Sequence, residues 1–426
     1  MIGDTTDFPA ASGEIQPLGH AETVPAAPDA LPPIVAQEPP VDAEEFEAAF
    51  GESLAHALDL ATWVPGDEMD ALYGRLEQEV EAAVAQENLV RAKVRDEIFP
   101  RLRTRPKALP GAGVFQATVA QVEQIHRGLL FNGLVEACDG TSAMTETLPI
   151  GVAQIGVCLT SYQGDRGSWV HRMFRRDLRV GGLDPVDETL RILERRRDSS
   201  SFDGGNRRDT MSELARRGIM AFAERAVLME KSSAPWRMGH GNPAPYELLT
   251  GSGMRDLLES SIHLLQQLVI DHRQFVFVPS SANRFLLTIG DALHPLEYAV
   301  VDSIEDDLTR IVERGHYRGA WADMIPEVRR FAREAGSKIA VGVFRASTMA
   351  PPQVFYAHVD CVHEAALIAL ADSALQEHRG FPMLIDLAHT VCSATFGGTA
   401  ISELTKLAYV EAGAPYRYMT ERQSRK

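Results

Sequence analysis

The sequence predicts an α/β protein in which a mixed sheet is flanked by helices and preceded by an acidic, helical and partly disordered extension. From residue 114 onward, short apolar segments bounded by turn residues alternate with amphipathic segments, a pattern typical of mixed strands and helices. Residues 1–100 contain 21 acidic and 4 basic residues, whereas residues 101–426 contain 38 of each. The net charge of −17 therefore lies in the extension, and the neutral body can still carry a local basic surface.

The extension has two parts. Residues 1–41 are rich in Pro, Ala and acidic residues without periodicity, which predicts disorder. Residues 42–105 are predicted to form a helical arm, and Pro106–Gly113 is a Pro/Gly linker. The arm is typical of a solvated helix or a coiled-coil arm, and docking on a partner is the alternative. Its narrow apolar stripe recurs every four residues and consists of Leu72, Leu76, Val80 and Val84.

The body, residues 106–426, begins with three predicted strands. The first is the apolar segment 134–138, which ends before Asp139; the others are residues 150–162 and 168–174. Because only short turns separate them, we expect an antiparallel meander.

An amphipathic helix is then predicted over Arg208–Glu224, with a strand over residues 226–229 directly after it. Further helices are predicted at 254–271, 362–378, 382–396 and 400–412, and further strands at 275–279, 339–344 and 354–359.

Several classes of protein are excluded by the sequence. No segment approaches the roughly 18 consecutive apolar residues of a membrane span. The N-terminus has neither a basic start nor an apolar core, so it does not predict a secretory signal. No phosphate-loop or dinucleotide-binding signature is present. The cysteines lie far apart without a CxxC pair, which favours a reducing, cytoplasmic compartment; they are Cys138, Cys158, Cys361 and Cys392.

The first candidate for chemistry is Asp139, followed by Gly140-Thr141-Ser142. A carboxylate at the end of a strand is held on a fixed backbone, and rigid carboxylates suit hard divalent cations such as Mg²⁺ or Mn²⁺. The alternative is an ordinary Asp-Gly turn that closes a hairpin.

The second candidate is a pair of glutamates. Glu213 lies in the predicted helix, nearly opposite its apolar stripe and beside Glu224, so a solvated charge is the alternative. Glu230 ends the predicted strand that follows, where Lys231 could simply neutralise it. Glu247 is a further acid that could take the place of Glu230.

The third candidate is His389, which shares a predicted helical face with Ile385, Cys392 and Phe396. It is a candidate metal ligand or proton carrier near neutral pH, and a hydrogen-bonded core histidine is the alternative. A group of arginines supplies a local basic excess for DNA phosphates, although interspersed acids could pair with them. These are Arg172, Arg175, Arg176 and Arg179.

The order of these segments resembles the NurA family of DNA nucleases. That family has an Asp-Gly-Ser motif, a helix with a Glu, a strand ending in an acid, a Val-Lys-Ser-type strand and a Gly-Tyr-Pro…Ala-His segment. Over about residues 130–410 the sequence has Asp139-Gly140-Thr141-Ser142, Glu213, Glu230, VFVPSS (276–281) and Gly380-Phe381-Pro382…Ala388-His389. Two motifs depart from the pattern: Glu230-Lys231-Ser232-Ser233 lacks the family's Asp and Gly, and VFVPSS lacks its Lys.

The resemblance implies an RNase H-like core, a homodimer, Mn²⁺-dependent cleavage of DNA (with Mg²⁺ as an alternative ion) and a HerA-type hexameric ATPase as partner. It implies that Asp139, Glu230 and Glu213 hold the ions and that His389 binds metal or carries a proton. Because two motifs depart, a NurA-like subunit that clamps DNA without cutting is an alternative, and an RNA- or guide-using hydrolase is a third. Cleavage polarity, strand preference and a role in repair or antiviral defence stay open.

Overall fold

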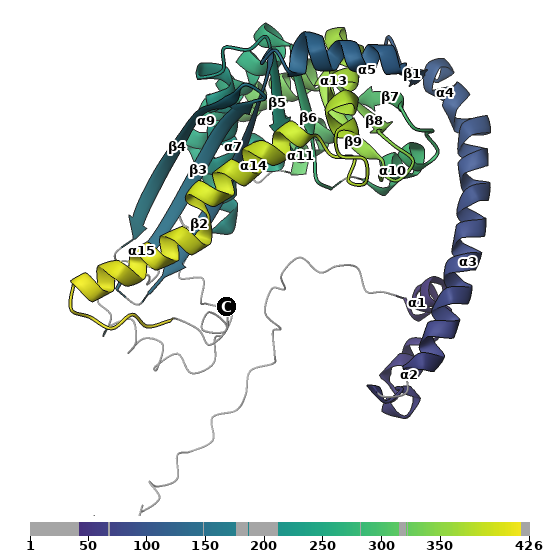
Figure 1. Ribbon diagram of the computed structural model, residues 1–426, viewed down its shortest axis with the longest axis horizontal. Helices are drawn as coiled ribbons and strands as arrows, with labels where there is room; N and C mark the ends of the chain where they lie inside the picture. Colours follow the sequence, from purple (N-terminus) through teal and green to yellow (C-terminus); the bar gives the residue numbers. More distant parts are fainter. Residues whose placement is uncertain are drawn as a thin grey trace, which may run out of the picture. The chain divides into compact units, whose positions relative to one another are not determined.

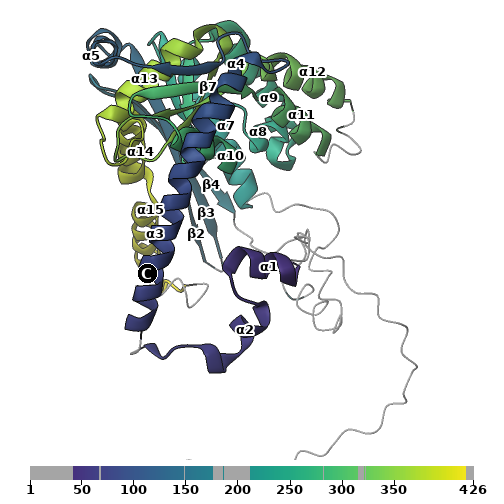
Figure 2. The ribbon, with the colours of Figure 1, turned by 90° about the vertical axis from the view of Figure 1, so that its right-hand side faces the viewer.

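The structure is a computed structural model that describes residues 42–66, 69–147, 149–175, 186, 212–281, 283–314, 321 and 323–418 (Figures 1 and 2). Its contacts divide the chain into two compact units, and the described part of the first unit is residues 42–63. The described part of the first unit is helical, as predicted. Asp42 and Ser53 accept backbone hydrogen bonds at the starts of its helices, whose residues are not buried. These are α1 (Ala43–Phe50), α2 (Leu54–Leu58) and the short helix η1 (Leu60–Thr62).

The second unit begins with the long helix α3 (Asp70–Lys93), which continues into η3 (Val94–Ile98) and α4 (Phe99–Thr104). The predicted apolar stripe on α3 is exposed, with Leu76 at 56%. After α3, the chain contacts the sheet, because Arg95 of η3 forms an ion pair with Glu297 of β7 at 2.8 Å. The predicted helical arm therefore contains a free apolar stripe and an end that packs on the sheet.

The second unit contains a mixed sheet of nine described strands in the order β1-β7-β8-β9-β6-β5-β2-β3-β4. β2 runs parallel to β5, and β5 runs parallel to β6, while the other neighbours are antiparallel. The predicted antiparallel meander is confirmed as β2-β3-β4. The strands are β1 (Gly113–Gln116), β2 (Val135–Glu146), β3 (Gly151–Ser161), β4 (Gly164–Arg175), β5 (Trp236–His240), β6 (Phe275–Val278), β7 (Glu297–Ser303), β8 (Ile339–Arg345) and β9 (Gln353–His358).

Helices cover both faces of the sheet, so the described body has two apolar cores (Figure 1). Alternation along β2 shows the division, because Cys138 belongs to one core and Ala137 to the other. The first core includes residues of α7 (Glu213–Glu230), α8 (Tyr246–Leu249), α9 (Arg255–Gln266), η7 (Gln267–His272), α10 (Arg284–Asp291), α11 (Glu305–Arg314) and α12 (Ile325–Gly336). The second includes residues of α5 (Val119–Ile125), η4 (His126–Leu130), α13 (Val362–Ala374) and α14 (Met383–Phe396). η6 (Gly251–Gly253), η9 (Val359–Cys361) and α15 (Gly398–Glu411) complete the described elements.

Two sequence predictions are wrong. The strand predicted at 226–229 belongs to α7, because a four-residue apolar run cannot distinguish a strand from a buried helical turn. Asp139 does not end a strand or sit in a turn; it lies inside the twelve-residue strand β2, opposite Cys158 of β3. β5 and β7 were not predicted, although both are largely buried.

A buried carboxylate fixes the start of α14. Asp372 of α13 is fully buried; its Oδ2 accepts the backbone N–H of Leu384 at 2.9 Å, and its Oδ1 accepts the hydroxyl proton of Tyr162. The N-cap residue of α14, Pro382, makes no side-chain hydrogen bond to the helix. Asp372 of α13 takes over this task, because it accepts one of the free N–H groups of the first turn. Burial raises the pKa of Asp372 to about 6.

We predict that Asp372→Asn removes part of the pH dependence of stability. Because the folded-state pKa exceeds the usual 3.8, the contribution of Asp372 is complete below pH 3.8 and is lost as pH rises through about 6. Asparagine mimics the protonated acid, so the variant should gain on the order of 3 kcal/mol relative to wild type between pH 4 and pH 8. Urea unfolding across this range measures the difference. Glu364→Gln, an exposed change on the same helix, is the control, and curves for Asp372→Asn that stay parallel to wild type would contradict the assignment.

Candidate active site around Asp139

Asp139 is the centre of a polar cluster between β2 and α14. Its side chain is 3% exposed, and both carboxylate oxygens have imidazole partners. Nδ1 of His389 lies 2.7 Å from Oδ2, and Nδ1 of His240 lies 3.2 Å from Oδ1. The structure thus brings together two residues that the sequence singled out, Asp139 and His389, and adds His240, which it did not.

His240 reaches the cluster through the parallel pairing of β2 and β5. Gly239 is the register partner of Cys138, so the last residue of β5 lies beside Asp139. The ring of Phe381, from the Gly-Phe-Pro segment, packs edge-on against His240 with 5.9 Å between ring centroids. The hydrogen bond between His240 and Asp139 is the main cause that raises the pKa of His240, and this shift favours the charged imidazolium.

Glu224 of α7 packs against Gly140, the residue after Asp139, on the α7 face of β2. A Cβ atom added to Gly140 would lie 2.7 Å from Oε1 of Glu224, so only glycine at this position leaves room for the glutamate. Burial raises the pKa of Glu224 to about 7, and the charge of Asp139 adds to this while Arg225 opposes it. A carboxyl group that titrates near neutral pH beside a second carboxylate is a common feature of catalytic sites.

Arg225 holds this part of the cluster together. Its side chain is 2% exposed, and its Nη1 lies 2.7 Å from Oε2 of Glu224. The same guanidinium donates to the backbone carbonyls of Asn242 at 2.5 Å and Pro243 at 3.1 Å, in the loop after His240. Arg225 therefore connects α7 to the end of β5 and compensates the buried charge of Glu224.

The other predicted acids lie elsewhere on the same helix. Glu213 is the first residue of α7 and Glu230 the last, and both are exposed. Glu213 precedes Glu224 by eleven residues, which corresponds to about 16 Å along a helix. Within the described chain, no hydrogen bond or ion pair joins either residue to Asp139. Glu247 of α8 is buried and pairs with Arg217.

Glu224 and His240 escaped prediction for different reasons. The helical wheel placed Glu224 on the polar face beside Glu213, but Glu224 packs against the sheet at 7% exposure. His240 ends a five-residue strand that lacks a long apolar run. β5, the strand after α7, ends at His240 and is followed by Gly241-Asn242.

The donor types of the cluster, two carboxylates and two imidazoles, suit divalent ions such as Mn²⁺. In their described positions these side chains bond to each other or to Arg225 rather than around a common point. Accordingly, the described residues contain no group of three or more His, Cys, Asp or Glu side chains arranged to hold a metal. Each imidazole bonds Asp139 through Nδ1, so an ion bound directly by the Asp139 carboxylate would displace at least one of these hydrogen bonds.

The predicted DNA-binding arginines are only partly described. Arg176 and Arg179 lie outside the described residues, and Arg175 is the last residue of β4. Arg172 donates to Oε1 of Gln154 at 2.6 Å, and that amide in turn donates to the carbonyl of Phe396 at the end of α14. Arg172 thus supports the packing of α14, and its partner is an amide rather than one of the interspersed acids.

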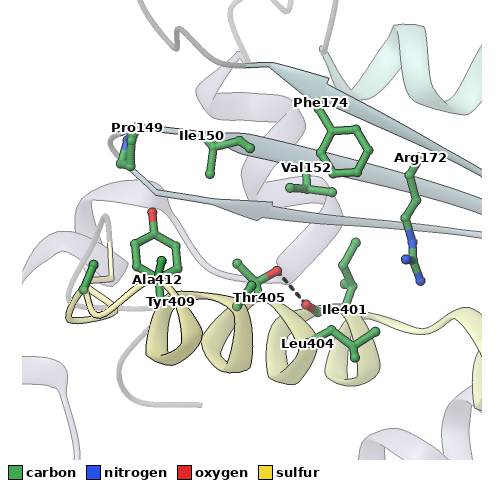
Figure 3. A pocket seen from close by; sticks show the side chains of 12 residues that line it. Pro149, Ile150, Val152, Arg172, Phe174, Ile401, Leu404, Thr405, Tyr409 and Ala412 are labelled. Atoms are coloured by element: carbon green, nitrogen blue, oxygen red, sulfur yellow. Dashed lines mark hydrogen bonds between the residues drawn. The ribbon is translucent and has the colours of Figure 1, made fainter.

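A pocket of about 390 Å³ lies between α15 and the β3–β4 strands (Figure 3). Its lining is mainly apolar, with Arg172 at one end and Tyr409 at the other. None of the residues around Asp139 lines it. The pocket is therefore separate from the candidate active site.

No protein-family model and no curated protein matches the sequence. Among solved structures, the chain is similar to the NurA nuclease from Sulfolobus solfataricus, with 10% identity and a TM-score of 0.43 over 80% of this chain and 98% of that chain. It is also similar to a NurA structure with manganese (9% identity, TM-score 0.32, 74% and 95% covered). Endonuclease V of Ciona intestinalis in complex with an inosine-containing DNA gives 10% identity and a TM-score of 0.26, with 64% and 87% covered. In the described part of the chain, no helix is long and apolar enough to cross a membrane.

We predict that Gly140→Ala destabilises the protein by about 1–3 kcal/mol, because the added methyl group overlaps Glu224 and Met220 of α7. Thermal or urea unfolding measures the loss. Gly128→Ala is the matched control, since a Cβ there meets nothing within 4 Å and should leave stability unchanged or raised. Equal stabilities of the two variants would show that α7 does not press against β2 at this point.

Proposed function

We propose that the protein is a metal-dependent deoxyribonuclease whose active site is the cluster around Asp139. The observation that carries the proposal is the convergence of Asp139, His240 and His389 from three different elements, with the buried Glu224 of α7 close enough for the charges of Asp139 and His240 to shift its pKa. A buried carboxylate hydrogen-bonded by two imidazoles, with raised pKa values at Glu224 and His240, is typical of hydrolytic sites. The motif order along the sequence supports NurA-type chemistry. The sheet is consistent with an RNase H-like core, because an antiparallel meander is followed by two strands, β5 and β6, that run parallel to β2.

The four side chains have distinct tasks in this proposal. Bound divalent ions would activate water and neutralise charge on the phosphoryl and leaving oxygens. Asp139 and Glu224 would hold the ions with their carboxylates, and His240 and His389 would complete the ligand set. His389, whose side chain is 59% exposed, is also the group best placed to exchange a proton with solvent. Arg225 favours the ionised form of Glu224 by offsetting its burial.

We predict that linear DNA is degraded in the presence of Mn²⁺ and not in EDTA, and that Asp139→Ala reduces the rate to background. His389→Ala should reduce it about 10²- to 10⁴-fold, the typical contribution of a proton-transfer group. Mn²⁺ should also raise the melting temperature of wild type but not of Asp139→Ala, because a ligand that binds only the folded state stabilises it. Full nuclease activity of Asp139→Ala would exclude the proposed site.

The choice among the acids is tested by glutamine variants, which keep size and remove charge. We predict that Glu224→Gln inactivates the enzyme, because Glu224 is a buried acid against Gly140 whose pKa is raised by burial and by the charge of Asp139. Glu213 and Glu230 stay predictions from the motif order, and Glu213→Gln, Glu230→Gln and Glu247→Gln are the matched comparisons. An inactive Glu230→Gln with an active Glu224→Gln would assign the second acid to the end of α7 instead.

A second candidate function is a NurA-like subunit that binds DNA without cutting it. Two observations favour it: β5 ends in His240 rather than an acid, and the described acids and imidazoles bond to each other. DNA binding without cleavage under Mn²⁺, Mg²⁺ and other divalent ions would establish this function. Cleavage that depends on Asp139 would exclude it.

We also propose that the protein forms a homodimer and works with a HerA-type hexameric ATPase, as the resemblance implies. The exposed stripe on α3 is a surface for such a contact, because Leu76 and Val80 are 56% and 51% exposed. We predict that the double change Leu76→Glu and Val80→Glu weakens co-purification with a HerA-type ATPase while stability stays within about 0.5 kcal/mol.

The control for this experiment is Gln78→Glu with Gln86→Glu, which adds the same charge at exposed positions of α3 off the stripe. Equal partner recovery with both double variants would leave α3 as a solvated spacer. Light scattering of the same samples reports whether the homodimer depends on the stripe.

A further inference from the structure

A buried arginine at the other end of the parallel strands has no partner for one of its donors. Arg237, the second residue of β5, is 9% exposed, and its buried Nε atom has no hydrogen-bond partner among the described residues. No described carboxylate lies within 4 Å of its guanidinium, so its charge is also unpaired at close range. Buried polar groups without partners are rare because leaving them unsatisfied is costly, and a bound ion is one way in which such a group is satisfied.

The nearest acid does not resolve this. Glu136 of β2 is the register partner of Arg237 and is 2% exposed. Its two carboxylate oxygens are used elsewhere: Oε1 lies 3.3 Å from Nε of Arg166, and Oε2 accepts the backbone N–H of Ser233 at 3.1 Å. Two arginines and one glutamate leave a net positive charge at this place.

Two further residues belong to this place: Ser232, which precedes the Ser233 that bonds Glu136, and His272, whose pKa is shifted by the charge of Arg237. Ser232, in the turn after α7, has a buried hydroxyl group without a partner in the described chain. His272, at the end of η7, has its pKa lowered to about 4 by burial and by the charge of Arg237, so it is neutral at physiological pH. The place therefore combines two donors without partners among the described residues, Nε of Arg237 and the hydroxyl group of Ser232, with an excess of positive charge. Arg166 adds its charge, while its Nε and Nη2 already donate to Ser161 and Gln163.

We propose that Arg237, together with Arg166 and the hydroxyl group of Ser232, binds a phosphate group. The guanidinium fork matches the spacing of phosphate oxygens, and the hydroxyl group adds a further donor. The small exposed fraction of Arg237 suits a free or terminal phosphate rather than the continuous backbone of a duplex.

This site is distinct from the cluster around Asp139. Glu136 and Asp139 are three residues apart on β2, about 10 Å along the strand, and alternation directs them to opposite faces of the sheet. Glu136 contacts the turn after α7, whereas Asp139 contacts α14. The phosphate-site proposal can therefore be tested independently of the nuclease proposal.

The first test is titration of the full chain with inorganic phosphate, in EDTA and at ionic strength held constant with chloride, followed by calorimetry and thermal unfolding. Wild type should bind phosphate and melt at a higher temperature with it. Arg237→Met should bind at least tenfold more weakly. Without phosphate, Arg237→Met should be as stable as wild type or more stable, because it removes an unpaired buried charge; a purely structural arginine would give the opposite result.

Controls make the result decisive. Arg273→Met changes an exposed arginine that pairs with Asp360 and should keep phosphate binding. Arg237→Lys keeps the positive charge but loses the planar guanidinium, so it should bind phosphate with intermediate affinity. This variant also tests the proposal if Arg237→Met fails to fold. Wild type that does not respond to phosphate, or Arg237→Met that responds equally, would overturn the proposal.

The source of the phosphate is distinguished by short single-stranded oligonucleotides with a 5′-phosphate or a 5′-hydroxyl group. Tighter binding of the phosphorylated strand that disappears in Arg237→Met and is competed by inorganic phosphate would assign the site to a nucleic-acid end. Equal binding of both strands, with phosphate binding retained, would assign it to free phosphate.

Discussion

The hydrogen bond between Asp139 and His389 joins β2 to α14 across 250 residues of chain. A carboxylate buried in a sheet is stable only if its oxygens are hydrogen-bonded or its charge is compensated. Asp139 meets this requirement with two imidazoles, one from the neighbouring parallel strand and one from the covering helix. The placement of α14 and of the end of β5 is therefore coupled to this one side chain.

The surrounding fold makes that contact possible from several directions. Gly156 of β3 allows Phe396 to pack flush on the sheet, since a Cβ there would lie 2.2 Å from the ring. Asp372 fixes the first turn of α14, and Gln154 holds its last turn by donating to the carbonyl of Phe396. His389 thus sits on a helix held at both ends, which is how a functional side chain acquires a defined position.

Buried charges in the body are mostly arranged in compensated groups. Glu224 is buried with Arg225, whose guanidinium also stacks on Phe277 at 5.1 Å. Arg237 differs from Arg225, because the acid beside it is occupied by Arg166 and Ser233. The contrast between a fully matched buried arginine and an unmatched one is consistent with two different roles, internal support and ligand binding.

The sequence by itself determined the mixed α/β class, the antiparallel meander and the C-terminal helices, because these segments carry long or strongly periodic apolar patterns. It also singled out Asp139 and His389, whose residue types and order stand out locally. Tertiary structure alone decided that Glu224 faces the sheet and that His240 lies beside Asp139. A helical wheel shows which residues share a face but not which neighbour covers that face, so it could not place Glu224 against the sheet. The register of two parallel strands separated by about a hundred residues is set by packing rather than by local sequence, so it could not be predicted for His240. For the same reason the strand predicted at 226–229 became the last turns of α7, where Val227 and Leu228 are buried by contacts with distant parts of the chain.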